Sequence, residues 1–172
     1  MDDKIIATFC LCDDLLKAMH HPEDRQCQMN DAEIMTTAFV ASLCFRGHHE
    51  SARAMLQQHG YIPHMVSKSR FSRRLHRIKE IFIILFDLLG QTWKMLNTDA
   101  ISVIDSIPMA VCDNIRIRRS KLYSNEAFRG YQASKKRYFY GLKIHLMVTQ
   151  DGQPVEGFLT PGGFGDVEAL KY

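Results

Sequence analysis

Residues 135–170, KKRYFYGLKIHLMVTQDGQPVEGFLTPGGFGDVEAL, contain the clearest structural pattern in the chain. From Tyr138 to Thr149 the side chains alternate between two faces, as in a β-strand. Asp151-Gly152 are the residues of a tight primed turn, and a return strand follows from Val155 to Thr160. The stretch therefore predicts a β-hairpin, with Pro154 at the start of its second strand.

An earlier strand is predicted at residues 101–111, ISVIDSIPMAV, which are rich in β-branched and apolar residues. Asp105 stands in the middle of this run, between apolar neighbours. A buried carboxylate costs free energy unless it is paired, hydrogen-bonded or bound to a cation. The residues alone leave two explanations open: a hydrogen bond to Ser106 or to a turn, or a ligand of a metal ion.

The connection between these strands, residues 114–137, is strongly basic and contains one acid, Glu126. Its cations are Arg116, Arg118, Arg119, Lys121, Arg129, Lys135, Lys136 and Arg137, and the aromatic residues Tyr123, Phe128 and Tyr131 lie among them. Such a segment suits a phosphodiester backbone, through counterion release and base stacking. An exposed basic loop with a structural aromatic cluster is the alternative. Lys143 and His145 share one strand face, where they could contact phosphate or simply face solvent.

Residues 1–97 predict a helical domain, since apolar residues recur there at helical spacing. Asn30 or Asp31 is expected to cap a helix that runs toward Gly47, and a short helix is expected from Glu50 to Gln58. Residues 81–96 predict a buried helix. The spacing of apolar residues changes from helical to strand-like near residues 96–100. We therefore place the domain boundary between residues 97 and 98.

Residues 67–85 carry a cationic stripe on a predicted helix. Its members, spaced at i, i+3, i+4 and i+7, are Arg70, Arg73, Arg74 and Arg77. A separate apolar stripe begins with Phe71 and Leu75, so one face can pack while the other binds phosphates in a groove of duplex DNA. The alternative is a solvated helix face, which is what most charge runs are.

Composition excludes several classes of protein. The chain has 172 residues, 46% of them hydrophobic, and a net charge of +3, which argues against a disordered tail. Its five cysteines include no CxxC pair, and their spacing with His20 and His21 does not suit a zinc finger. No signal peptide or membrane-length apolar run is present, so we expect a soluble intracellular protein.

Taken in order, the motifs VIDS, CDNIRIRR, RGYQASKKRYFYGLKIHLMV, DGQPV and LTPGGFGDV resemble bacterial insertion-sequence transposases with a DDE catalytic domain, most closely the insertion-sequence 982 family. The resemblance implies an RNase H-like fold in which three acids hold two Mg²⁺ or Mn²⁺ ions for in-line attack on a phosphodiester. The expected class is α+β: a helical N-terminal domain, then three antiparallel strands and the start of the first helix of that fold. Asp105 matches the first catalytic acid.

Asp166 is a candidate second acid and metal ligand, but its place in the chain favours another role. In RNase H-like sheets the second acid lies on the fourth strand, whereas Asp166 follows the third strand and begins a predicted helix. We therefore expect Asp166 to cap that helix beside the site. The second and third acids are then expected beyond Tyr172. We therefore expect residues 1–172 to be an inactive portion of such a transposase, with an open sheet edge and low stability.

The resemblance implies DNA transposition, by metal-dependent strand cleavage and transfer at insertion-sequence ends. The implied partners are double-stranded DNA with terminal repeats and further copies of the chain, in the bacterial cytoplasm at the nucleoid, with no membrane. The expected DNA contacts are Arg70, Arg73, Arg74, Arg77, Arg116, Arg118, Arg119, Lys135, Lys136, Arg137 and Lys143. A non-catalytic DNA-binding regulator or inhibitor of transposition is the alternative, and a helical interaction module is a third possibility.

Overall fold

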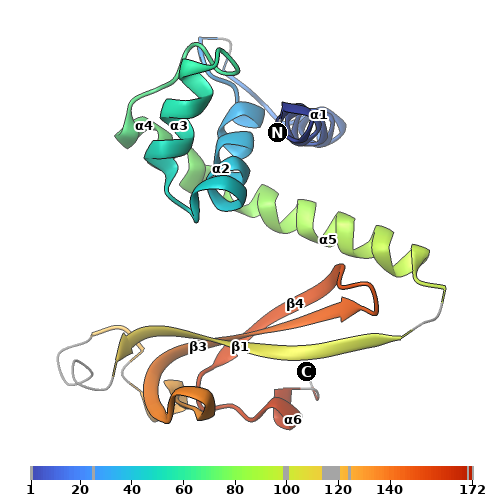
Figure 1. Cartoon of the computed structure of the whole chain (residues 1–172), viewed down its shortest axis with the longest axis vertical. Helices are drawn as coiled ribbons and strands as arrows, with labels where there is room; N and C mark the ends of the chain where they lie inside the picture. The colour runs from blue at the N-terminus through green and yellow to red at the C-terminus, as the bar shows by residue number, and fades with distance from the viewer. Residues whose placement is uncertain are drawn as a thin grey trace. The chain divides into compact units, whose positions relative to one another are not determined.

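A computed structural model describes residues 2–24, 26–98, 101–113, 121–123, 125–169 and 171. The chain forms two compact units, Met1–Leu85 (unit 1) and Phe86–Tyr172 (unit 2), which are drawn together in Figure 1. Unit 1 is helical and unit 2 contains the sheet, so the α+β class expected from the sequence is confirmed. The boundary between units 1 and 2 falls within the helix Lys79–Leu96, whereas the spacing of apolar residues changes from helical to strand-like only after that helix ends.

Unit 1 is built around one central helix. Its elements are α1 (Asp2–Ala18), α2 (Asp31–Phe45), α3 (His49–Gln58), α4 (Lys68–Arg77) and the first residues of α5 (Lys79–Leu96). Helices α1, α3 and α4 each pack against α2. Most α2 residues from Asp31 to Ala41 are buried, since α2 meets a neighbour on several sides.

Local sequence fixes both ends of α2. The Asn30 side chain accepts the Glu33 N–H at 2.7 Å, and the Glu33 carboxylate accepts the Asn30 N–H at 2.7 Å. This reciprocal pair is a capping box, and it confirms the predicted start of the helix. The helix ends at Arg46 and Gly47, which both take positive φ values, +52° and +83°.

The predicted cationic helix and the predicted buried helix are two helices, α4 and α5, that are separated at Ile78. Ile81 and Leu85 are buried, but Ile83, Ile84 and Leu88 are exposed. The expectation that residues 81–96 are buried is therefore wrong for one face. A helix that is apolar on most sides buries only those sides that meet a neighbour.

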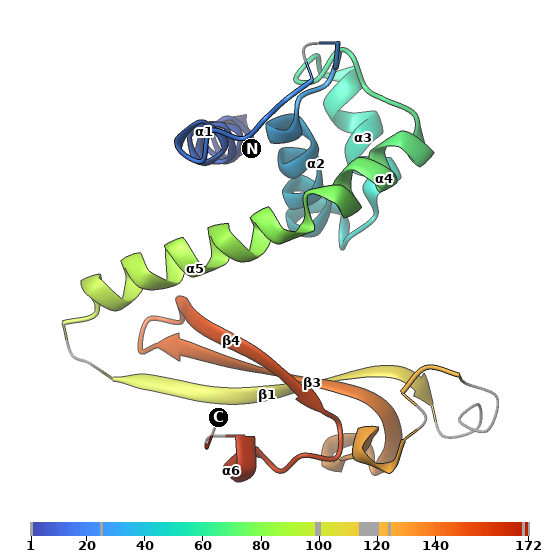
Figure 2. The same ribbon diagram turned by 180° about the vertical axis from the view of Figure 1, so that it is seen from behind.

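Unit 2 is an antiparallel sheet arranged around one long strand. Its elements are β1 (Ser102–Asp113), η2 (Glu126–Phe128), β2 (Arg129–Gln132), η3 (Ala133–Lys135), β3 (Arg137–Thr149), β4 (Pro154–Pro161) and α6 (Asp166–Ala169). Ile144 of β3 pairs with both Ile107 of β1 and Leu159 of β4, so β1 and β4 flank β3 on opposite edges. Figures 1 and 2 both show β1 and β4 beside β3.

The three strands expected from the sequence are confirmed, and β2 is a fourth within the described residues. Tyr140 pairs with Cys112 of β1 and with Arg129 of β2, so β2 continues the β4 edge of β3. Strand β2 has four residues, RGYQ, inside the basic connection. A run that short shows no clear alternation, which is why the sequence did not reveal it.

The hairpin between β3 and β4 is confirmed, but its turn differs from the one expected. Thr149 N–H donates to the Gln153 carbonyl, and Gly152 N–H donates to the Thr149 carbonyl, both at 2.9 Å. Within this loop only Gly152 has a positive φ, +83°, whereas a two-residue type I′ turn needs two such residues. The connection is therefore a three-residue loop that the glycine closes.

Strand β1 lies at the edge of the described sheet and carries exposed apolar side chains. These are Val103, Ile107, Met109 and Val111. The core of unit 2 contains Phe139, Tyr140 and Val155, and α5 contributes Gly90, where an added Cβ would lie 2.3 Å from the Val155 carbonyl oxygen. The low stability expected of an open edge remains a prediction.

Gly141→Ala is predicted to destabilise unit 2 by about 3 kcal/mol, because overpacking a close contact forces the backbone apart. An added Cβ would lie 2.0 Å from the Met109 carbonyl oxygen, across the β1–β3 pairing. Gly165→Ala is the matched control, since nothing lies within 4 Å of its added Cβ. Hydrogen exchange at β3 amides should be faster in the first variant alone, and equal protection in both would contradict the packing.

Candidate functional sites

Asp166 joins three elements of unit 2. Its Oδ1 accepts a hydrogen bond from Ser106 Oγ of β1 at 2.8 Å and one from Lys143 Nζ of β3 at 3.2 Å. Lys143 Nζ also donates to the Phe164 carbonyl at 2.8 Å. The sheet therefore holds the start of α6 through a lysine and a serine on one face.

The carboxylate of Asp166 is kept ionised by these partners. The Ser106 hydroxyl, followed by Lys143, holds the pKa of Asp166 below its usual value, although partial burial acts in the opposite direction. Asp166 is the first residue of α6, where the sequence predicts a helix cap. The contacts found for its side chain are those to Ser106 and Lys143, and its assignment as cap or ligand stays a prediction.

His145 lies on the same face of the sheet as Ser106 and Lys143, but it is a hydrogen-bonded core residue. It is buried, its Nε2 lies 2.8 Å from Thr160 Oγ1, and its ring stacks on Phe158 with centroids 4.8 Å apart. Because His145 is buried, both alternatives given for it, contact with phosphate and exposure to solvent, are wrong. Its imidazole packs in the sheet beside Ser106, which is paired with His145 across β1 and β3.

Asp105 lies within β1, as the sequence predicts, but it is exposed, so the burial from which the sequence argument started is wrong. Its side chain leaves the strand on the face opposite to Ser106, because successive strand residues alternate. Asp105 Oδ1 nevertheless accepts the Ser106 N–H at 2.7 Å, so the carboxylate bends along the strand. Asp105 and Asp166 both line one cavity of about 220 Å³, together with Ser106 and His145.

This cavity fits a divalent cation in part. Mg²⁺ takes oxygen ligands and is often bound through one or two carboxylates plus substrate phosphates. Asp105 has no ion-pair partner among the described residues, so it fits a ligand role. Asp166 already holds the ammonium of Lys143, which would repel a second cation. Within the described ranges, no group of three or more His, Cys, Asp or Glu side chains could hold a metal ion.

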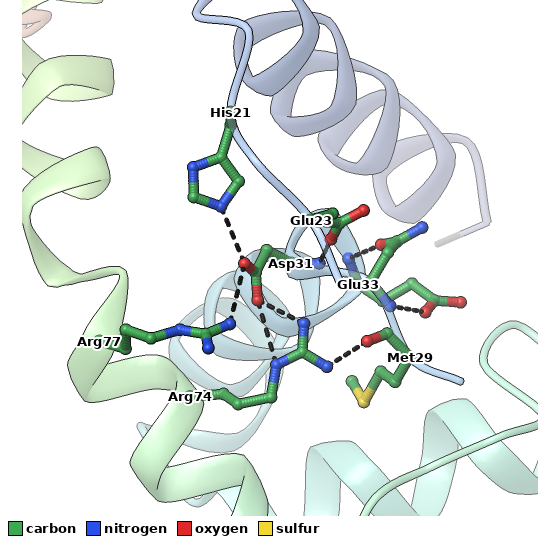
Figure 3. A network of polar contacts seen from close by, with 8 residues as sticks. His21, Glu23, Met29, Asp31, Glu33, Arg74 and Arg77 are labelled. Atoms are coloured by element: carbon green, nitrogen blue, oxygen red, sulfur yellow. Dashed lines mark hydrogen bonds and ion pairs between the residues drawn. The ribbon is translucent and has the colours of Figure 1, made fainter. Parts of the chain in front are cut away.

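The predicted cationic face of α4 contains two kinds of arginine. Arg70, Arg73 and Arg77 are exposed. Arg74 is different, because its guanidinium donates to Asp31 Oδ1 and to the Met29 carbonyl, and its side chain is only 13% exposed (Figure 3). The structure therefore places three of the four arginines where a phosphate can reach them.

Asp31 is the residue that sequence reasoning missed. Its side chain is fully buried and is contacted by Arg74, by Arg77 at 3.5 Å and by His21 Nε2 at 2.9 Å (Figure 3). Burial by itself would raise the pKa of Asp31, but the hydrogen bonds from His21 and Arg74 and the charges of both arginines outweigh it and lower that pKa. From the sequence, Asp31 is predicted only as one of two residues that could cap the helix.

The remaining predicted DNA contacts belong to unit 2. Lys135, Lys136 and Arg137 are exposed at η3 and the start of β3. Lys143 is partly buried and bonded to Asp166. The expected contacts Arg116, Arg118 and Arg119 lie outside the described residues.

Asp31→Asn is predicted to destabilise unit 1 by about 3 kcal/mol at neutral pH, because the largely buried guanidinium of Arg74 loses its counter-charge. Asp13→Asn is the control, since Asp13 forms an i,i+4 pair with the exposed Lys17, and such surface pairs contribute little to stability. Urea unfolding followed by the helical signal measures both.

The difference in stability between wild type and Asp31→Asn should also depend on pH. Because folding lowers the pKa of Asp31, its stabilisation is complete above the usual aspartate value of about 3.9 and is lost as the pH falls through the lowered folded value. The stability gap between wild type and Asp31→Asn should therefore narrow in acid. A gap that stays constant from neutral to acidic pH would contradict this role.

Comparison with known proteins concerns mainly unit 2. Residues 95–172 match a protein-family model described as a transposase DDE domain. No curated protein and no solved structure matches the chain. Among the described helices, none is long and apolar enough to cross a membrane. The segment that contains the whole described sheet, Asp105 and Asp166 is thus similar to the DDE domain of transposases, which supports a role in DNA transposition.

Proposed function

We propose that this chain acts in DNA transposition as a DDE-type transposase polypeptide, and that its substrate is duplex DNA at the terminal repeats of a bacterial insertion sequence. The observation that carries the proposal is the match of residues 95–172 to the transposase DDE domain, with Asp105 on β1 at a cavity that Asp166 also lines. The order of motifs favours the insertion-sequence 982 family. Assembly of several copies at the DNA ends is part of the same proposal.

Asp105 is the residue that we assign to metal binding. In this role it would hold Mg²⁺ or Mn²⁺, which supplies activation of water or a 3′-hydroxyl for attack on a phosphodiester. The chain's own residues then orient this carboxylate: the Ser106 N–H fixes one of its oxygens. Lys143 and Ser106 keep Asp166 at the edge of the same cavity.

We also propose that this chain by itself does not transfer DNA strands. Two-metal chemistry needs several carboxylates, and at this cavity Asp166 is already paired with Lys143. A non-catalytic regulator of transposition is the second candidate. It is favoured by the arginine face of α4, which lies in unit 1, as does Asp31, the partner of Arg74 and Arg77. Strand cleavage or transfer by the purified chain would contradict both the proposed inactivity of the chain alone and the regulator as second candidate.

DNA binding through α4 predicts a steep loss of affinity with added salt, because each phosphate contact releases counterions. Arg70→Ala with Arg73→Ala should weaken binding of duplex DNA and reduce the slope of log Kd against log salt by about two. Lys4→Ala is the control, since Lys4 is an exposed cation on α1. Fluorescence anisotropy over a salt series measures the slopes. Binding that does not change with salt would reject a DNA role for unit 1.

Metal binding at Asp105 predicts that Mn²⁺ stabilises unit 2 by about 1.4 kcal/mol at a concentration about ten times its dissociation constant. Asp105→Asn should lose this effect, whereas Asp151→Asn, an exposed carboxylate in the hairpin loop, should keep it. Thermal unfolding with and without the ion measures the difference. The same stabilisation in all three proteins would show that Asp105 is not the ligand.

A further inference from the structure

Unit 1 contains a cavity of about 490 Å³ beside the arginine face. The arginines of α4 line it, and so do residues 26–28 of the segment that precedes α2. Among its described lining residues there is no carboxylate, so the cavity is positively charged and suits an anionic group.

Two of the four arginines supply most of this available charge. Arg74 is occupied by Asp31 and the Met29 carbonyl, and Arg77 lies 3.5 Å from Asp31 Oδ2. Arg70 and Arg73 have no carboxylate partner among the described residues. Arg73 Nε donates to the Ser69 carbonyl of its own helix at 3.3 Å, which leaves its terminal nitrogens able to donate to a ligand. A guanidinium presents several N–H groups in a fork that fits a phosphate.

The segment opposite this charge is held in place rather than loose. Cys27 N–H donates to the Asp24 carbonyl at 2.9 Å, and Gln26 N–H donates to Asp24 Oδ1 at 3.0 Å. Just after it, the carbonyl of the buried Met29 accepts a hydrogen bond from Arg74 of α4. The hydrogen bond between Arg74 and Met29 links this segment to the arginine helix.

Two amide side chains belong to this segment. Gln26 and Gln28 are exposed and line the cavity. Neither amide has a hydrogen-bond partner among the residues that the structure describes. A glutamine amide offers one donor and one acceptor side by side, and this is the pattern that pairs with the N6 and N7 edge of adenine in the major groove.

We infer that this cavity is the sequence-reading site of unit 1 for duplex DNA. Arg70 and Arg73 hold a backbone phosphate, and Gln26 and Gln28 contact a base edge next to it. Phosphate contacts alone carry no sequence information, whereas amide contacts to base edges do. The inference rests on the proposed DNA function and adds the residues that give it sequence preference.

The first test is selection from a pool of randomised duplexes. The wild type should enrich one sequence, and Gln26→Ala with Gln28→Ala should lower the preference for that sequence over a scrambled duplex about fivefold or more. Affinity for the scrambled duplex and the salt slope should not change. Gln57→Ala, at an exposed glutamine of α3, is the matched control. All three glutamines are exposed, so folding should be unaffected, and circular dichroism checks this.

The second test uses Cys27, which lines the same cavity. Saturating duplex DNA should slow alkylation of Cys27 several-fold, as measured by mass spectrometry, and leave the exposed Cys10 and Cys44 unchanged. Salt-dependent binding with an unprotected Cys27, or with an unchanged preference in the glutamine variant, would overturn this inference and leave the proposed function standing. Absence of DNA binding by the wild type would overturn both.

Discussion

The helical unit depends on one buried charge, the carboxylate of Asp31. Removing a carboxylate from water costs several kcal/mol unless cations and hydrogen-bond donors replace the water. Arg74, Arg77, His21 and the capping position at the start of α2 provide these partners. Because Arg74 belongs to α4 and Asp31 to α2, this requirement fixes how the arginine helix lies on the central helix. The functional face of α4 is therefore set by a contact that is itself buried.

The sheet unit follows a different constraint, which is that β3 must satisfy both of its edges. Strand β1 covers one edge, and β4 with β2 covers the other. Side chains along β3 alternate between the two faces, so Lys143 and His145 fall on the face that carries Ser106. That face holds α6 through Asp166. The register of β3 thus places Lys143 where it pairs with Asp166, whereas Asp105 has no ion-pair partner among the described residues.

The sequence predicted the parts of this architecture that have local causes. Asn30 and Glu33 mark the start of α2, and the alternation from Tyr138 to Thr149 marks β3. It did not predict the bond between Asp31 and Arg74, because 43 residues separate them and no periodic pattern connects them. For the same reason the cationic stripe of α4 could not be divided in advance into arginines that pack and arginines that remain exposed. Tertiary contacts make that division.

Asp105 and Asp166 show why residue type alone does not assign a metal ligand. Both are aspartates at one cavity, but Lys143 neutralises Asp166, whereas Asp105 is bonded only by a backbone N–H among the described residues. A cation that approached the cavity would be attracted by Asp105 and would have to compete with Lys143 at Asp166. Both contacts of Asp166 are made by its Oδ1, so a metal ion at the other oxygen would share the carboxylate with the ammonium of Lys143.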